Sequence, residues 1–180
     1  GGTLNQTGAT AITNTGGGTV TVSGGTVNLA GSVTMPILAM TGGTLNLTNP
    51  AAVSISSLAF SNSSMLSTAG ALNIGTMTVS GNGISTLTGP GTKTISGTLT
   101  FQPTPSAYPY LYVDGTTLNT QGAVSQTVNG TSKVRVQLSN GATVNNTSTW
   151  TMNSFDITSA GTGTNTFNNS GAGRLDVLGT

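Results

Sequence analysis

The apolar residues of this chain occur in short alternating runs separated by glycine and small polar residues. In the run Thr44-Leu45-Asn46-Leu47 the leucines alternate with polar neighbours, which is the period of a half-buried strand. Comparable runs lie at residues 20–22, 53–55, 77–79 and 134–138. No segment has the apolar spacing of an amphipathic helix. The pattern therefore predicts an all-β chain built from many short strands.

One motif recurs along the chain: a small residue, threonine, an aliphatic residue and asparagine. Its clearest copies are Gly24-Gly25-Thr26-Val27-Asn28-Leu29 and Gly42-Gly43-Thr44-Leu45-Asn46-Leu47. The aliphatic position recurs 18 to 31 residues apart, at Leu4, Val27, Leu45, Leu72, Leu99, Leu118, Val144 and Leu175. Units this short are stabilised by stacking on their neighbours. We therefore expect a parallel β-helix (β-solenoid) of about seven to eight irregular coils, with the first seven of these side chains in inward-facing stacks.

An antiparallel sandwich is the main structural alternative. It requires hairpin turns at regular intervals, and Asn82-Gly83, Asn129-Gly130 and Asn140-Gly141 are suitable dipeptides. A motif that recurs in one orientation is explained more directly by parallel stacking, so the solenoid is favoured.

The asparagine of the motif predicts a column along the rod. Six asparagines directly follow the aliphatic position: Asn5, Asn28, Asn46, Asn73, Asn119 and Asn145. Stacked in register, their amides would donate to carbonyl oxygens of the next coil and fix the register between coils, as asparagine ladders do in cross-β assemblies. The competing interpretation is a ligand surface formed with Thr3, Thr26, Thr44, Thr117 and Thr143.

Composition favours a thin aliphatic core. Aromatic residues make up 4% of the chain, while threonine and glycine occur 36 and 27 times. Charged residues are also 4%, so the chain lacks the high charge typical of disordered segments. With a net charge of +1 and no cluster of lysine and arginine, no nucleic-acid surface is expected. No apolar run approaches the length of a membrane span.

Catalytic residue types are scarce. The chain has no histidine, glutamate or cysteine, and its only carboxylates are Asp114, Asp156 and Asp176. Those absences remove the usual general bases, thiol nucleophiles and most zinc ligands. We therefore expect no enzyme activity, no catalytic residues, no cofactor and no metal site.

The segment 102–114 departs from the repeat. It contains three of the six prolines and all three tyrosines. In an extended strand Tyr108, Tyr110 and Tyr112 would share one face, with Leu111 and Val113 on the other. The tyrosines are then the best candidates for glycan contact. Alternatively, the segment is a Pro-stiffened loop, or a seam between two sections of the solenoid, whose tyrosines pack over a corner.

Two further features have structural interpretations. Residues 133–138 alternate polar and apolar side chains, which predicts a half-buried strand with a solvated polar face. The alternative is a small contact with an anion. Trp150 and Phe155 are expected to be core or cap residues.

The repeats resemble those of large bacterial surface proteins, namely autotransporter passengers and filamentous-haemagglutinin-like adhesins. The resemblance rests on the Gly-Gly-Thr-Leu-Asn-Leu unit, on Gly89-Pro90-Gly91-Thr92, and on the segments 139–146 and 166–171. It implies a right-handed β-helix, secretion to the bacterial cell surface, and a stalk or adhesive role. It assigns no catalytic or ligand residue to any position.

These observations lead to a functional expectation. Residues 1–180 are predicted to form a single solenoid segment of a longer repeat protein, because the chain opens within a repeat. Its role would be an extracellular structural rod, such as a stalk, a surface filament or a fibre building block, whose partners are neighbouring coils or copies of the same protein. The alternative is an adhesin that binds glycan or protein through one face. A third hypothesis, ice binding, rests on five Thr-x-Thr pairs at irregular spacing.

Overall fold

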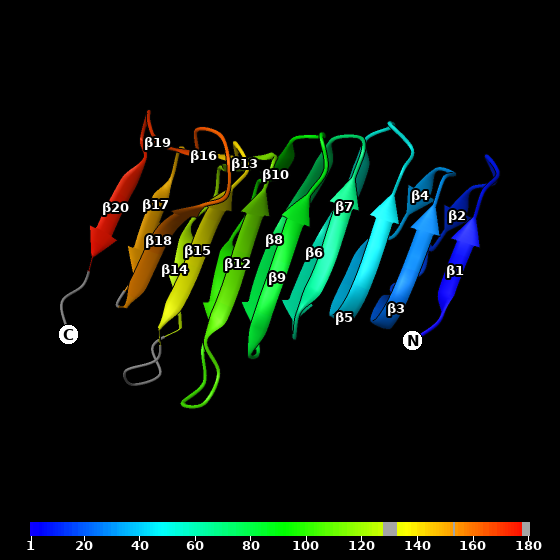
Figure 1. Cartoon of the computed structure of the whole chain (residues 1–180), viewed down its shortest axis with the longest axis horizontal. Coiled ribbons are helices and arrows are strands. Elements are labelled where there is room, and N and C mark those ends of the chain that lie inside the picture. The colour runs from blue at the N-terminus through cyan, green and yellow to red at the C-terminus, as the bar shows by residue number, and fades with distance from the viewer. Residues whose placement is uncertain (128–132, 153, 178–180) are drawn as a thin grey trace.

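The chain folds into a parallel β-solenoid of about eight coils (Figure 1). The computed structural model describes residues 1–127, 133–152 and 154–177, and within these ranges every regular element is a strand. The strands run across the long axis of the rod, and β1 and β20 lie at its opposite ends (Figure 1). The predicted all-β parallel solenoid is confirmed.

Three faces are formed by strands that follow one another along the rod. The first face carries β1 (Thr3–Gln6), the second halves of β3 (Thr19–Leu29) and β5 (Ile37–Leu47), β7 (Ser64–Thr68), β9 (Gly83–Thr88), β12 (Pro109–Asp114), β15 (Val134–Ser139) and β18 (Phe155–Ala160). Every one of these pairings is parallel, which excludes the antiparallel sandwich over the described residues.

The other two faces alternate with the first around each coil. The second face carries the first halves of β6 (Val53–Ser61) and β8 (Leu72–Ser80), then β10 (Lys93–Ile95), β13 (Thr117–Thr120), β16 (Thr143–Asn146) and β19 (Thr166–Asn169), with the small sheet of β2 (Ile12–Thr13) and β4 (Val33–Thr34) in the first two coils. The third face carries the first halves of β3 and β5, the second halves of β6 and β8, and β11 (Leu99–Gln102), β14 (Val124–Gln126), β17 (Thr149–Met152) and β20 (Arg174–Val177).

Each face contributes more than one column of inward side chains, and on each face one of these columns contains the recurring aliphatic positions. The first-face column is Leu4, Val27, Leu45, Leu66, Leu87, Val113 and Leu138. The second-face column is Val53, Leu72, Lys93, Leu118, Val144 and Phe167. The third-face column is Leu38, Leu58, Met77, Leu99, Val124, Trp150 and Leu175. The recurring aliphatic positions therefore belong to all three columns, because the motif marks a corner followed by a strand rather than one place in the coil.

The Gly-Gly pairs of the motif form a corner that admits no side chain. Gly25 and Gly43 have φ angles of 71° and 75°, a region that favours glycine. A Cβ atom on Gly43 would lie 2.6 Å from the carbonyl oxygen of Gly25 in the preceding coil. Successive corners therefore stack backbone on backbone.

The core is narrow and closely filled. Leu45, Leu72, Leu99, Leu118 and Val144 are almost completely buried, as predicted, and Val27 is half-buried. Leu4 contradicts the prediction of burial because it is 61% exposed. It lies in the first coil of the structure and is covered from one side only.

Aromatic side chains fill the core near the C-terminal end. Trp150 is fully buried, which confirms its assignment to the core. Its ring meets Phe155 and Phe167 edge-on, at centroid distances of 5.8 and 5.0 Å. Phe155 is half-buried and also packs beside Phe101.

A lysine replaces an aliphatic residue in the second-face column. Lys93 has no exposed surface. Its ammonium group donates hydrogen bonds to the carbonyl oxygens of Gly89 and Gly91 at 2.8 and 2.5 Å, and to that of Thr68 at 3.5 Å. The structure pairs it with no carboxylate among the described residues. Burial lowers the pKa of Lys93 to about 8.

The Pro- and Tyr-rich segment is divided between a corner and a strand. Residues 103–108 leave the coil as a turn closed by reciprocal backbone bonds between Thr104 and Ala107, and this turn projects from the rod in Figure 1. Residues 109–114 form β12, which pairs with β9 on one side and β15 on the other. Pairing of the coils is thus continuous across the segment.

Replacing Leu45 by aspartate should destabilise the fold strongly. The side chain is 1% exposed, so the substitution buries a charge without a partner, at a cost of about 3–5 kcal/mol. Ser54→Asp is the matched control, since Ser54 is an exposed outward residue of the same coil. Urea unfolding followed by circular dichroism measures both; equal losses in the two variants would contradict the inward placement of Leu45.

Stability should rise with pH as Lys93 loses its proton. Its pKa of about 8 in the folded chain lies below the ordinary value of 10.5, so between these values the unfolded chain binds more protons. The free energy of unfolding should therefore increase from pH 8 towards pH 10.5, by up to about 3 kcal/mol. Lys93→Met should abolish this slope while leaving the titration of exposed residues unchanged. An identical slope in both proteins, measured by urea unfolding, would refute it.

Candidate functional site

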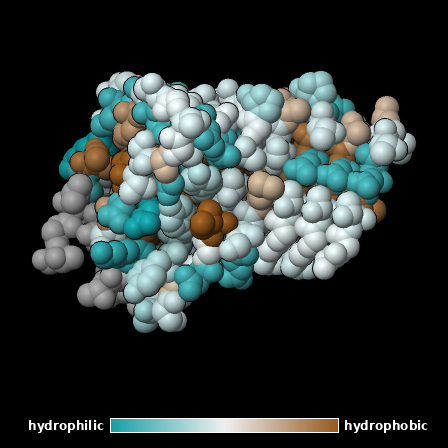
Figure 2. All heavy atoms as spheres, viewed as in Figure 1, coloured by the Kyte–Doolittle hydropathy of each residue, from teal (hydrophilic) through white to brown (hydrophobic). Residues whose placement is uncertain are grey.

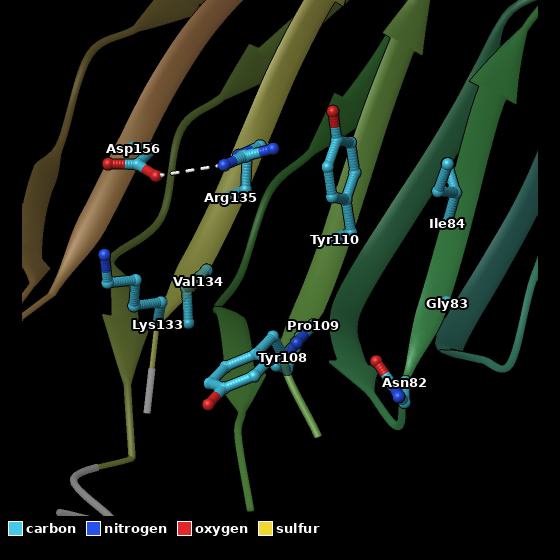
Figure 3. Close-up of a pocket in the computed structure, with 10 residues that line it drawn as sticks. All are labelled: Asn82, Gly83, Ile84, Tyr108, Pro109, Tyr110, Lys133, Val134, Arg135 and Asp156. Atoms are coloured by element: carbon cyan, nitrogen blue, oxygen red, sulfur yellow. Dashed lines mark hydrogen bonds and ion pairs between the residues drawn. The ribbon is translucent and has the colours of Figure 1, made fainter. Parts of the chain in front are cut away.

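A groove on the first face is the candidate surface site. It has a volume of about 350 Å³ and lies at the amino ends of β9, β12, β15 and β18 (Figure 3). Its lining residues are Asn82, Gly83, Ile84, Tyr108, Pro109, Tyr110, Lys133, Val134, Arg135 and Asp156. Four successive coils therefore build the site, and segments up to 74 positions apart in sequence line it.

Strand register places four outward side chains of this groove in one column. Ile84 pairs with Tyr110, Tyr110 with Arg135, and Arg135 with Asp156. The guanidinium carbon of Arg135 lies 5.3 Å from the centre of the Tyr110 ring. One guanidinium nitrogen, Nη2, lies 3.4 Å from Oδ2 of Asp156. An aromatic ring, a cation and an anion thus lie side by side across three coils.

The charged side chains of this column are exposed to solvent. Tyr110 and, to a smaller extent, Asp156 raise the pKa of Arg135 above its ordinary value, so the guanidinium remains charged. Both side chains of the Arg135–Asp156 pair are nearly half exposed, and exposed pairs of this kind contribute little to stability. The arrangement orients the charges more than it holds the fold together.

The tyrosines are only partly brought together as predicted. Leu111 and Val113 are fully buried, so Tyr110 and Tyr112 do point outward from β12. Tyr110 and Tyr112 are half-buried, however, and Tyr112 lies outside the groove. Tyr108 precedes the strand and is 51% exposed, with its ring directed towards Lys133 and Val134 (Figure 3). The exposed aromatic surface is therefore one ring.

Residues that the tyrosine pattern does not indicate complete the groove. Ile84 is 48% exposed although it lies within β9. Arg135 belongs to a strand whose apolar side chains are buried, as predicted, while Arg135 and Gln137 lie on its outer side. Only the register between coils shows that Ile84 and Arg135 flank Tyr110.

Exposed apolar side chains are rare elsewhere. In Figure 2 the hydrophobic residues on this side form small separate patches among hydrophilic ones. The large exposed hydrophobic residues of the described chain are Leu4, Ile12, Ile84, Tyr108, Ile157 and Leu175. Four of the six belong to the first or last coil, and the remaining two, Ile84 and Tyr108, line the groove.

The asparagines form two ladders rather than the single predicted column. On the first face, Nδ2 of Asn28 donates to Oδ1 of Asn5 and Nδ2 of Asn46 donates to Oδ1 of Asn28, both at 2.6 Å. On the second face, Asn145 donates to Asn119 at 2.9 Å and Asn168 donates to Asn145 at 2.8 Å.

The acceptors are carbonyl oxygens of the neighbouring coil, as predicted, and they belong to asparagine side chains. The ladders differ from the sequence-based prediction in two further ways. Asn73 lies in the second-face column but between Ser54 and Thr94, without an amide neighbour. A single ligand surface formed by all six asparagines is also wrong, because the residues occupy two faces.

A further amide, Asn146, is buried at a corner. Its Nδ2 donates to Oδ1 of Asn169 at 2.7 Å and to the carbonyl oxygen of Ser148 at 2.6 Å. The hydroxyl of Thr120 donates to Oδ1 of Asn146 and accepts from Nε1 of Trp150, both at 3.1 Å. The adjacent residues Asn145 and Asn146 point to opposite sides of the strand, as expected because successive side chains of a β-strand alternate.

The three aspartates do not assemble. Asp114 accepts a hydrogen bond from Asn140, Asp156 pairs with Arg135, and Asp176 pairs with Arg174 on the third face. Strand register aligns no two aspartates with each other. The described residues contain no cluster of acidic, histidine or cysteine side chains suited to a metal ion.

The third face carries four of the five Thr-x-Thr pairs. Thr76 and Thr78, for example, lie one coil from Thr98 and Thr100. Other residues occupy the equivalent outward places of several coils, including isoleucine, alanine and serine, and arginine and aspartate in the last coil, so the threonine rows are interrupted.

Comparison with known proteins identifies no relative. No family model, no curated protein and no solved structure matches the chain significantly. Across the part of the chain that the structure describes, no helix has the length and apolar character to span a membrane.

Breaking the first-face ladder should lower stability by a small, position-dependent amount. Asn28 contributes to two amide bonds and Asn5 to one, so Asn28→Ala should cost about 1 kcal/mol and Asn5→Ala about half that. Asn73→Ala is the control, since its position matches but no amide neighbours it. A loss in Asn73→Ala as large as in Asn28→Ala, by urea unfolding, would show that the ladders contribute nothing specific.

Proposed function

We propose that this chain is a structural rod segment of an extracellular protein, acting as a stalk, a surface filament or a fibre building block. One observation carries the proposal: parallel pairing on the first face continues without interruption from β1 to β18. A continuous ladder of this kind transmits load along the axis and sets a fixed distance between whatever lies at its two ends.

The polar residues support this role. The two asparagine ladders and the Asn146 network join one coil to the next. Lys93 and the corner glycines also interact with the neighbouring coil. The polar chemistry of the chain is thus used largely for stacking, and the dispersed aspartates favour a non-enzymatic role.

The finer identity is inferred from the repeats. We infer an origin at the bacterial cell surface, as in autotransporter passengers and filamentous-haemagglutinin-like proteins, whose repeats these resemble. A right-handed coil is favoured because parallel crossover connections are right-handed in about 98% of cases. Partners of the rod would be neighbouring coils or further copies of the protein.

A second candidate function is contact with a glycan or a protein through the first face. The groove favours it, because Ile84 and Tyr108 are the large exposed apolar residues away from the end coils. The two functions are compatible, since a rod can present a binding site along its side.

A rod made of equivalent coils should tolerate removal of one complete coil. Leu66 and Leu87 occupy equivalent places, so deletion of residues 66–86 joins Met65 to Leu87 in register. We expect a folded chain shortened by about 4.8 Å, measured by small-angle scattering and circular dichroism. Deletion of residues 66–85 is the control, because a slip of one residue moves every side chain to the opposite side of the strand.

Two outcomes would contradict the structural role. Unfolding of the in-register deletion would show that the coils are not interchangeable. Turnover of a polysaccharide that disappears in Asp156→Asn or Asp176→Asn would instead establish an enzyme.

A further inference from the structure

The groove on the first face combines an exposed aromatic ring, an aliphatic side chain and an accessible cation. We propose that it binds a sugar ring carrying one anionic group, a carboxylate or a sulfate. This inference rests on the second candidate function, contact through the first face, and specifies its ligand. It is independent of the rod.

Apolar surface on both sides of β12 fits a pyranose ring. Ile84, which is about half exposed, lies beside Tyr110 on the β9 side, and Tyr108, also about half exposed, extends its ring towards β15 (Figure 3). A tyrosine offers a flat apolar face with a polar tip. A pyranose presents a flat C–H face bordered by hydroxyl groups, so it can cover the ring while Asn82 at the rim offers its amide for hydrogen bonding.

The cations of the groove select the charge of the ligand. Of the four basic residues, Lys93 is buried and Arg174 is paired with Asp176. The other two, Lys133 and Arg135, both line the groove. Arg135 forms an ion pair with Asp156, whereas the described residues provide no ion-pair partner for Lys133. One unbalanced positive charge therefore remains for an anionic group.

The size of the groove favours a sugar over a protein surface. Its volume of about 350 Å³ is near the lower end of the range of small-molecule sites, about 300–1,000 Å³. A stable protein interface requires about 800 Å² from each partner. A terminal mono- or disaccharide unit fills a space of this size, whereas a folded partner would need surface well beyond it.

The proposal can be tested on an array that presents each acidic glycan beside its neutral counterpart: glucuronate with glucose, and sulfated with unmodified galactose. We expect the whole chain to bind acidic members, with the carboxylate and sulfate arms identifying the preferred anion. Lys133→Gln and Tyr108→Ala should each weaken binding about tenfold. Binding should also weaken as the salt concentration is raised, because the ion pair between Lys133 and the anionic group of the sugar would be exposed to solvent.

Matched variants separate the groove from general effects. Arg174→Gln removes the same charge on another face, and Tyr112→Ala removes an aromatic ring of β12 that lies outside the groove. Both should bind as the unmodified chain does. Circular dichroism melting of every variant confirms that lost binding is not lost folding.

Each contrary result has a distinct meaning. Equal binding of neutral counterparts would overturn the charge selection and leave contact through the first face standing. Binding that the groove variants do not change would overturn this site. Absence of glycan binding by the folded chain would overturn the sugar assignment, and self-association lost in Ile84→Asp would assign the groove to a second copy. None of these results bears on the proposed structural role of the rod, which the coil deletion tests separately.

Discussion

Parallel hydrogen bonding between successive coils is the constraint on which the whole structure depends. A single coil pairs almost none of its strand backbone internally, so its amides and carbonyls are satisfied by the coils on either side. Once that register is fixed, every position becomes a column: leucine on leucine inside, amide on amide outside, glycine on glycine at the corner. A slip of one residue would exchange the inner and outer side chains of a strand. The interactions within all the columns therefore stabilise the same register.

Because many side chains in each column contribute to stability together, a single core position can hold a residue that is not aliphatic. Lys93 occupies a core position between Leu72 and Leu118. It is accommodated because the adjacent corner turns carbonyl oxygens towards its ammonium group. The cost is the desolvation that lowers its pKa. Outward positions accept a wider range of residue types than core positions. The column that begins with Ile84 continues with an aromatic, a cationic and an anionic residue while the core remains unchanged.

Sequence could predict the local features and the parallel stacking of coils, but not which residues of successive coils lie side by side. Alternation in runs such as 134–138 identified strands and their buried sides, because period two is a property of one strand alone. It could not assign motif copies to faces, since Leu45 and Leu72 follow similar sequences at different corners. Burial of Lys93 was beyond reach because isolated lysines are almost always exposed. The pairing of Ile84, Tyr110 and Arg135 depends on coil lengths of 26 and 25 residues, which only the register defines.

The position of the groove follows from where those coils are lengthened. On the path from the third face to the first, β8 and β9 are separated by residues 81–82 alone, whereas residues 103–108 separate β11 from β12. The extra residues are added at a corner, so β12 keeps its place in the stack while Tyr108 is delivered beside it. A solenoid can therefore acquire a side site without disturbing its ladder: the corner supplies the exposed ring, and the fixed register of the strands supplies Ile84, Arg135 and Asp156 opposite it. The irregular coil length, which weakens the repeat as a sequence signal, is thus the physical means by which a uniform rod carries one distinct surface.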